Sequence, residues 1–423
     1  MNAFPHVPPE GRPRRRPKRR TVLATLASSA ATALPLLSAA PAGASPERAD
    51  DLLYVGTWGQ GEVHAVRFDP ADGTMTPLGA VAQVSANWVT AHPSLPVLYV
   101  AGAEQGGFVR VFRIDDASGA LREIGEVETQ PVPAGSGGLS FIGLTPDADA
   151  LLIADFAAGA AATVPVGADG LLGAVTSRVQ DTGSGPDPRQ SGPHPHHVVV
   201  TPHRRSALVA DFGADRVFVH DYDRATHRLS TAAPDGPAAY ATAPGSGPRR
   251  LAFHPNGQTV YLLNELTADL QALHWDTSRG RLTNRQTLST NAPGHTGATS
   301  AAELAVSRDG RHVYTSNRGE NTLVVFSVNP GSGLLTEVQR VPCGGVTPWS
   351  FALHPGGRWL FVANEASGTV NLFRVAQGSG HLTDTGTSVA VPFPDCITFR
   401  VRACTPDSTL PSAPRCGGSS SLR

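Results

Sequence analysis

The sequence of 423 residues predicts an all-β protein, a β-propeller with seven blades in which a strand from the C-terminal end closes the first blade. Three observations predict this fold. A four-strand pattern recurs about every fifty residues, which is typical of repeat architectures. No stretch after Ala44 shows a sustained helical period, and Pro and Gly punctuate the chain throughout. The first repeat unit also lacks the strand with which every later unit begins.

The repeat is easiest to follow at a short anchor motif, which in most units ends in His-Pro or Thr-Pro. The anchors stand at positions 93, 146, 202, 255, 308 and 355, at intervals of 53, 56, 53, 53 and 47 residues. A turn and a β-branched or aromatic strand follow each anchor, then a third strand, and then a more polar fourth strand after Gly-x-Leu. Four short antiparallel strands bury both faces when they are stacked radially, so a propeller is favoured. Tandem sandwich domains, the alternative, explain neither the regular anchors nor the incomplete first unit.

The ends of the repeat region predict how the ring closes. Six units are complete, whereas the first shows only residues 52–55, 63–66 and 78–81 as strands. Residues 396–399 (Cys-Ile-Thr-Phe) follow the last complete unit and resemble the first strands elsewhere. We therefore expect this segment to complete the first blade within a propeller domain of residues 45–400, followed by a disordered tail of residues 401–423.

The first 44 residues predict a removable signal peptide. Seven basic residues precede an apolar, Ala- and Leu-rich stretch over residues 22–40, and Ala42-Gly-Ala44 is the small-x-small pattern of a cleavage site. Arg19-Arg20 resembles a twin-arginine signal, so we expect a secreted or extracytoplasmic protein without stable membrane association after cleavage. A retained anchor is the alternative, but Pro35 interrupts a stretch that should hold about 20 strongly apolar residues.

Charge and cysteine content narrow the function. The whole chain has 34 basic and 35 acidic residues, but without the leader 27 basic residues face 34 acidic ones. No basic block remains after Arg20, which argues against nucleic-acid binding. The four cysteines form no metal-binding pair. We expect buried thiols at Cys343 and Cys396, while Cys404 and Cys416 lie in the tail and could pair in an oxidising compartment.

Aligning the repeats separates scaffold residues from candidates for chemistry. In a propeller the first strand of each blade lines the central channel, and the loop after its second strand opens at one mouth. Six residues before the anchors stand Asn87, Ser140, His196, Arg249, Ala302 and Trp349, and ten residues after the later anchors stand Phe156, Phe212, Glu265, Arg318 and Glu365. His196, Arg249, Glu265 and Arg318 break the pattern in consecutive blades.

These four residues are the predicted catalytic set, and their types suit the opening of an ester or lactone. A carboxylate or imidazole can activate water, and guanidinium groups can stabilise a developing oxyanion and hold an anionic substrate. The residues alone equally allow a structural interpretation, in which Glu265 and Arg318 form an ordinary inter-blade ion pair and His196 is a satisfied buried histidine.

Several motifs together resemble the lactonase family of seven-bladed propellers, which contains cycloisomerase-type 6-phosphogluconolactonases and carboxy-cis,cis-muconate lactonizing enzymes. The resemblance covers residues 52–399. Its motifs are His194-Pro-His196-His-Val-Val-Val-Thr-Pro202, Asp211-Phe-Gly-Ala-Asp-Arg216, Gly247-Pro-Arg-Arg-Leu-Ala-Phe-His-Pro-Asn-Gly257, Asn264-Glu-Leu266, Asp309-Gly-Arg-His-Val-Tyr-Thr-Ser-Asn-Arg-Gly319 and Ala363-Asn-Glu365. The resemblance implies a functional histidine at His196, arginines at Arg249 and Arg318, and a glutamate at Glu265. We also expect substrate contacts from His194, Asn87, Trp349 and Glu365.

The resemblance implies a monomeric lactonase that acts on a small sugar-acid or related anionic lactone without a metal or other cofactor. A non-catalytic binding propeller and a muconate-type cycloisomerase are the alternatives. Pro348-Trp349 stands where the family usually has Pro-Arg, which removes one potential anion ligand, and export argues against a phosphorylated cytosolic substrate. His194, His196 and His197 on one strand suggest a metal site, but no carboxylate that could serve as a third ligand is evident nearby. Asn264, Asn317 and Asn364 suggest a calcium site, but we expect them to be strand-end turn residues because they recur across blades.

Overall fold

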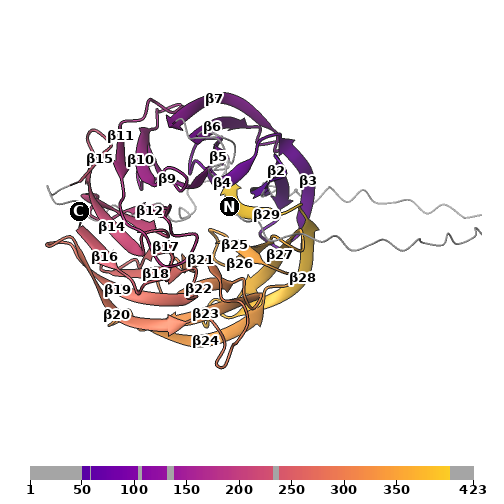
Figure 1. Ribbon diagram of the computed structural model, residues 1–423. Coiled ribbons are helices and arrows are strands. Elements are labelled where there is room, and N and C mark those ends of the chain that lie inside the picture. The colour runs from indigo at the N-terminus through magenta and orange to yellow at the C-terminus, as the bar shows by residue number, and fades with distance from the viewer. Residues whose placement is uncertain (1–49, 58, 103–106, 131–137, 232–237, 401–423) are drawn as a thin grey trace, which may run out of the picture. The chain divides into compact units, whose positions relative to one another are not determined.

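The computed structural model describes residues 50–57, 59–102, 107–130, 138–231 and 238–400, and all regular structure in these ranges is β-strand. The strands form seven separate antiparallel sheets arranged around a central axis (Figure 1). This confirms the seven-bladed propeller. The expected signal peptide, the tail and its cysteines Cys404 and Cys416 lie outside the described residues. No helix among the described residues has the length and apolar character needed to cross a membrane.

The strands of each blade run from the axis outwards in the following order. Blade 1 contains β29 (Pro394–Arg400), β1 (Asp51–Thr57), β2 (Val63–Phe68) and β3 (Met75–Ala82). Blade 2 contains β4 (Ala86–Ala91), β5 (Val97–Gly102), β6 (Gly107–Ile114) and β7 (Leu121–Gln130). Blade 3 contains β8 (Leu139–Leu144), β9 (Ala150–Asp155), β10 (Ala160–Pro165) and β11 (Ser177–Gln180). Blade 4 contains β12 (Pro195–Val200), β13 (Ser206–Asp211), β14 (Arg216–Asp223) and β15 (Arg228–Ser230), and β16 (Ala238–Ala241) also pairs with β14.

The last three blades have four strands each. Blade 5 contains β17 (Pro248–Phe253), β18 (Thr259–Asn264), β19 (Asp269–Asp276) and β20 (Arg281–Ser289). Blade 6 contains β21 (Ala301–Val306), β22 (His312–Asn317), β23 (Thr322–Val328) and β24 (Leu335–Pro342). Blade 7 contains β25 (Pro348–Leu353), β26 (Trp359–Asn364), β27 (Thr369–Val375) and β28 (Leu382–Ala390).

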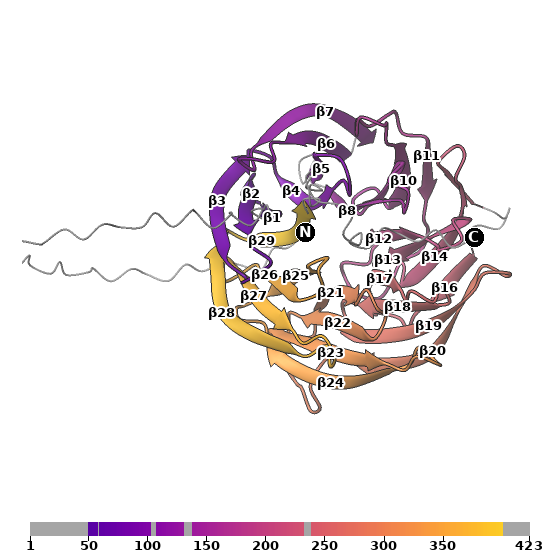
Figure 2. The same cartoon turned by 180° about the vertical axis from the view of Figure 1, so that it is seen from behind.

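The ring closes in blade 1, as the sequence predicts. Strand β29 pairs antiparallel with β1, with Leu53 opposite Phe399 and Val55 opposite Ile397. Figure 2 shows the yellow C-terminal strand beside the indigo N-terminal one. The apolar core is divided among seven clusters, each between the facing sheets of two neighbouring blades, so blade 1 packs on blade 7 as any other pair does. Cys343 and Cys396 are free and buried within this core, which confirms the prediction for both thiols.

Aromatic residues of the second strands link neighbouring blades by hydrogen bonds. Tyr54, in blade 1, donates its hydroxyl to the carbonyl of Gly119 in a turn of blade 2, at 3.0 Å. Gly119 has φ of 79°, which suits glycine, and it leaves no room for a side chain near Leu78. Equivalent bonds run from Tyr99 to Gly170, Tyr261 to Gly333 and Tyr314 to Gly380. Trp359 of blade 7 donates to the carbonyl of Pro70 in blade 1, so the contact also spans the closure.

Each innermost strand has a β-bulge at its second residue, and this bulge positions the candidate site. The residues flanking that position pair with the second strand of the blade, while the residue itself has no pairing partner. A bulge bends the strand and re-aims a side chain. The unpaired residues are Asn87, Ser140, His196, Arg249, Ala302 together with Glu303, Trp349 and Asp395.

Candidate active site

The four residues predicted to be catalytic form one contact cluster, in which two arginines bind the Glu265 carboxylate and His196 binds one of those arginines. Arg249 Nη1 lies 2.5 Å from Glu265 Oε2 and also 2.5 Å from His196 Nε2. Arg318 Nη2 lies 2.8 Å from Glu265 Oε1. Arg249 and Arg318 come from blades 5 and 6 and His196 from blade 4, so the repeat alignment correctly grouped residues that are 53 or more positions apart in the chain.

A fifth residue, Arg189, also contacts this carboxylate. It belongs to the connection between β11 and β12, and its Nη1 lies 3.4 Å from Glu265 Oε1. Asp187 holds the Arg189 guanidinium from the other side, at 3.0 Å. The side chain of Arg189 is 58% exposed, whereas those of Arg249 and Arg318 are 4% and 9% exposed. The Glu265 carboxylate therefore contacts two buried guanidinium groups, those of Arg249 and Arg318, and the solvent-exposed guanidinium group of Arg189.

The charges around Glu265 fix its protonation state. Burial alone would raise the pKa of this carboxyl, but the charges of Arg318, Arg249 and Arg189 outweigh burial and hold the pKa below its ordinary value. Burial in turn lowers the pKa of Arg318 to about 10, although the Glu265 charge acts against that change. At neutral pH the cluster therefore holds three guanidinium groups and the ionised Glu265, and with the Asp187 carboxylate that pairs with Arg189 it has an excess of one positive charge.

His196 is neutral at the same pH. Burial, followed by the charges of Arg249 and Arg250, lowers the pKa of its imidazole well below the usual range. Because a guanidinium can only donate, the contact with Arg249 assigns the lone pair to Nε2 and the proton to Nδ1. The Nδ1 atom is buried and has no hydrogen-bond partner among the described residues. His196 thus differs from the satisfied histidine of the structural alternative, since it keeps one free N–H donor.

Trp349 covers the arginines on the side of blade 7. Its ring lies 4.4 Å from Arg318 Cζ and 5.8 Å from Arg249 Cζ, within the range of cation–π attraction. The tryptophan that replaces the arginine of the family pattern therefore supports two other arginines. This contact places the predicted substrate residue Trp349 at the edge of the cluster.

A second layer of side chains lies one residue further along the innermost strands. Arg250 forms an ion pair with Glu303, with Nε and Oε1 3.1 Å apart, and its Cζ lies 4.1 Å from the Trp88 ring and 5.3 Å from the Phe141 ring. These partners come from blades 6, 2 and 3, so one arginine of blade 5 extends across the axis. Ser350 also donates to Glu303, at 3.2 Å. This layer therefore joins blades 2, 3, 5, 6 and 7 next to the Glu265 cluster.

Arg318 is held by the segment that leads into blade 6. Its Nη2 donates to Ser300 Oγ at 2.8 Å, and its backbone N–H donates to the Ser300 carbonyl at 2.7 Å. The backbone N–H of Ala301 donates to the carbonyl of Glu265 at 3.0 Å. The position of Arg318 relative to Glu265 therefore depends on the loop between β20 and β21.

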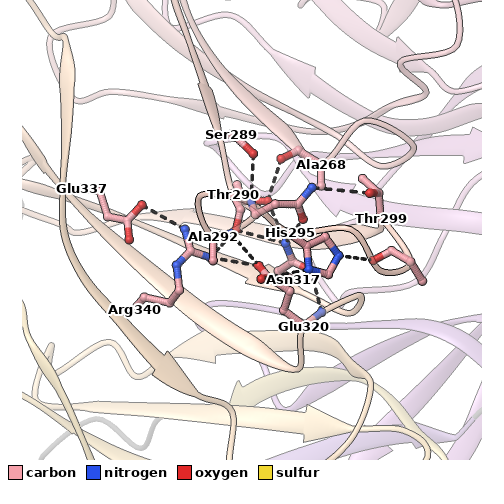
Figure 3. A network of polar contacts seen from close by, with 12 residues as sticks. Ala268, Ser289, Thr290, Ala292, His295, Thr299, Asn317, Glu320, Glu337 and Arg340 are labelled. Carbon is pink, nitrogen blue, oxygen red and sulfur yellow. Dashed lines mark hydrogen bonds and ion pairs between the residues drawn. The ribbon is translucent and has the colours of Figure 1, made fainter.

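A polar network centred on Glu320 fixes that loop (Figure 3). Glu320 accepts from the backbone N–H of Ala292 at 2.9 Å, lies 3.2 Å from His295 Nδ1 and forms an ion pair with Arg340 at 3.3 Å. Asn317 donates to two loop oxygens, Thr290 O at 3.0 Å and Asn291 Oδ1 at 2.7 Å. Because Asn317 and Glu320 flank Arg318 in the chain, the network connects the loop to the arginine that it supports.

The remaining predicted substrate residues lie around the cluster. His194 stacks on Phe156, with ring centroids 4.4 Å apart, and its Nδ1 lies 2.7 Å from the Phe156 carbonyl, so it supports the wall of blade 3. Asn87 donates to the carbonyl of Leu139 at 3.1 Å while its Oδ1 has no partner among the described residues. Glu365 follows β26 and raises the pKa of Asp395, which places the two carboxyl groups near each other.

The asparagines and histidines considered as metal ligands make other contacts, although Asn264 Oδ1 and Asn364 Oδ1 have no hydrogen-bond partner among the described residues. Asn264 donates to Asp269, Asn317 to the β20–β21 loop, and Asn364 to the Cys343 carbonyl and to Asn371. His197 packs on Phe141, with ring centroids 4.1 Å apart. Within the described ranges, no three His, Cys, Asp or Glu side chains gather as a metal-binding group.

Sequence alignment missed four residues of this region: Arg189, Arg250, Glu303 and Asp395. Arg250 and Glu303 each stand one residue after the aligned position, which is Arg249 in blade 5 and Ala302 in blade 6. An alignment of that next position would have revealed both. A proline stands directly before the aligned position in four blades, and it could have revealed Asp395. These prolines are Pro195, Pro248, Pro348 and Pro394, which precede His196, Arg249, Trp349 and Asp395. Arg189 lies in a connection outside the repeat, where the sequence carries no such signal.

The fold is a closed seven-bladed propeller, and the site brings together a neutral imidazole, an ionised carboxylate and buried arginines. Such a set can activate water and stabilise an oxyanion. The family description "Lactonase, 7-bladed beta-propeller" matches residues 52–399, and the chain belongs to this family.

Individual relatives are similar over most of their length. The chain is 29% identical over 352 residues to a 6-phosphogluconolactonase of Bacillus subtilis, covering 82% of this chain and 97% of that protein. Among solved structures, a periplasmic gluconolactonase of Pseudomonas aeruginosa is 34% identical with a TM-score of 0.75, and the match covers 83% of this chain and 99% of that one. A putative 6-phosphogluconolactonase of Bacteroides fragilis is 26% identical with a TM-score of 0.73, covering 84% and 99%.

Proposed function

We propose that this protein is an extracytoplasmic lactonase that hydrolyses a sugar-acid or related anionic lactone without a metal ion. The observation that carries the proposal is the convergence of Arg249 and Arg318 on the ionised Glu265, with His196 bonded to Arg249. The similarity to proteins named 6-phosphogluconolactonase and gluconolactonase supports the reaction class.

The electrostatics support a division of roles within the cluster. Glu265 is ionised and can take a proton from the attacking water, while His196 presents a free Nδ1–H that can donate to the carbonyl oxygen as negative charge develops there. Arg249 and Arg318 carry fixed positive charge close to the same position. An aldonate carboxylate, the product of ring opening, would meet the positive excess of the cluster.

The test is a hydrolysis screen of the purified protein with D-glucono-1,5-lactone, its 6-phosphate and several unphosphorylated lactones, each with and without EDTA. We expect turnover above the spontaneous rate that EDTA does not change. Loss of turnover with EDTA would contradict the metal-independent mechanism. No turnover on any lactone would favour a binding propeller, and lactone formation from an unsaturated dicarboxylic acid would favour a cycloisomerase.

The proposed location has its own test. A leader with Arg19-Arg20 and a cleavage site at Ala42-Gly-Ala44 supports export, and one similar structure is a periplasmic enzyme by name. The intact mass of the protein recovered outside the cytoplasm should correspond to a chain that begins at Ser45. Replacing Arg19 and Arg20 by Lys should leave the full-length chain inside the cell, and unchanged export would contradict a twin-arginine signal.

A further inference from the structure

Asp395, in blade 1, occupies the same structural position as His196 and Arg249. In β29, Pro394 pairs with Thr57 and Cys396 with Gly56, which leaves Asp395 as the unpaired residue of the bulge. Strands β12 and β17 have the same arrangement, with a paired proline before the unpaired His196 or Arg249. The bulge therefore aims Asp395 towards the level of the Glu265 cluster.

The Asp395 carboxyl is buried but has no hydrogen-bond partner at normal geometry among the described residues. The residue is 2% exposed, and both of its carboxyl oxygens lack such a partner. Gly56 leaves the space for it, since a Cβ there would lie 2.9 Å from Asp395 Oδ1. At the equivalent position in other blades, Ser140 donates to Pro195 O at 2.8 Å and Arg249 Nε to Ala302 O at 2.8 Å. Asn87 Oδ1 and His196 Nδ1 lack a partner there, but each of those side chains has a second polar atom that is bonded, whereas Asp395 has both carboxyl oxygens without one. A buried polar group without a partner is rare and points to a role beyond packing.

The surroundings keep this carboxyl protonated near neutral pH. Burial raises the pKa of Asp395 to about 7, and the Glu365 charge adds to this, although the Cys396 thiol and local backbone amides act the other way. Burial also raises the pKa of the Cys396 thiol well above its usual range, so that thiol is uncharged. Glu265 is ionised at the same pH, so the two acids of the site differ in protonation state, as a base and an acid must.

Asp395 also lies on the opposite side of the axis from the Glu265 cluster. In a closed ring of seven blades, blade 1 stands across the axis from blades 4 and 5, which carry His196, Arg249 and Glu265 (Figure 2). The separation is short at the next layer, where the single side chain of Arg250 extends from blade 5 to the Trp88 ring of blade 2. A sugar lactone between these walls would therefore have the base on one side and the Asp395 carboxyl on the other.

We propose, on the basis of the lactonase function above, that Asp395 is the general acid that protonates the leaving ring oxygen. Water attacks the carbonyl carbon and gives one proton to Glu265. The bond between the carbonyl carbon and the ring oxygen then breaks, and that oxygen takes the carboxyl proton of Asp395. The product acid ionises, Glu265 releases its proton to solvent, and Asp395 regains a proton from solvent, so the net reaction consumes one water.

The experiment compares Asp395→Asn with the wild-type protein on the best lactone of the screen across pH 5–9. Asparagine keeps the size and a hydrogen-bond donor but cannot transfer a proton, so we expect the same unfolding midpoint and a loss of kcat/KM of about 100-fold or more. Wild-type kcat/KM should fall as pH rises through about 7, because Asp395 loses its proton there, and this limb should be absent from the variant.

Asp155→Asn is the matched control. Asp155 is also a buried carboxyl with a pKa raised by burial, but it bonds to Ala158 and Arg178 at the end of β9. Activity and pH profile of this variant should stay as in the wild type. If Asp395→Asn keeps wild-type turnover or the same limb near pH 7, the role of Asp395 is refuted while the lactonase function stands. If the wild-type protein hydrolyses no lactone, the proposed function itself fails.

Discussion

Replacing Glu265 by Gln should strongly destabilise the fold, because this carboxylate is the shared counter-ion of two buried arginines. Its oxygens lie 2.5 Å from Arg249 Nη1 and 2.8 Å from Arg318 Nη2, and those side chains are only 4% and 9% exposed. Removing one partner of a buried ion pair leaves an uncompensated charge and costs about 3–5 kcal/mol. The third contact, to the exposed Arg189, should add little.

Urea unfolding at pH 7, followed by tryptophan fluorescence, measures this loss. Glu126→Gln is the control, because Glu126 pairs with Arg110 across β6 and β7 at the surface and should contribute less than about 1 kcal/mol. Adding Arg318→Met to Glu265→Gln removes one of the two stranded charges and should recover part of the stability. Unfolding of Glu265→Gln within about 0.5 kcal/mol of the wild type would refute the buried ion cluster.

Three further outcomes are expected. Arg189→Gln should lower kcat/KM more for D-glucono-1,5-lactone 6-phosphate than for the unphosphorylated lactone, by a factor that shrinks with added salt, and equal losses on both would count against it. Asp211→Asn should flatten the dependence of stability on pH between about 4 and 7. Burial and the Asp181 charge raise the pKa of Asp211 to about 7 in the folded protein, so the wild type loses stability as pH rises through that window; parallel urea-unfolding profiles would contradict this. Glu320→Gln should lower kcat several-fold, because it weakens the contacts that fix the loop holding Arg318. An unchanged kcat would contradict a role of this loop in positioning Arg318.

The fold could be predicted from the sequence almost completely, because each blade is a local unit that repeats. The anchors give the period, and a first unit without its first strand requires a partner from elsewhere in the chain, which β29 provides. The extra strand β16 of blade 4 was not predicted, since it pairs with β14 outside the four-strand pattern.

The spatial grouping of the candidate residues could be predicted as far as the repeat reaches. The register that precedes each anchor coincides with a β-bulge in every innermost strand, which is why His196 and Arg249 could be selected from position alone. The contact between Arg249 and His196, and the protonation states that follow from it, depend on side-chain distances that no alignment contains. Arg189 reaches Glu265 from an irregular connection, where position in the repeat predicts nothing.

The most direct test of the site is the rate of D-glucono-1,5-lactone hydrolysis by wild-type protein and by His196→Phe, corrected for spontaneous hydrolysis. Phenylalanine keeps an aromatic ring beside Phe156 and removes the free Nδ1–H donor. Loss of one such donor to a developing oxyanion should lower kcat by about 100- to 1,000-fold. Wild-type turnover in the correctly folded variant would contradict a lactonase site built around His196.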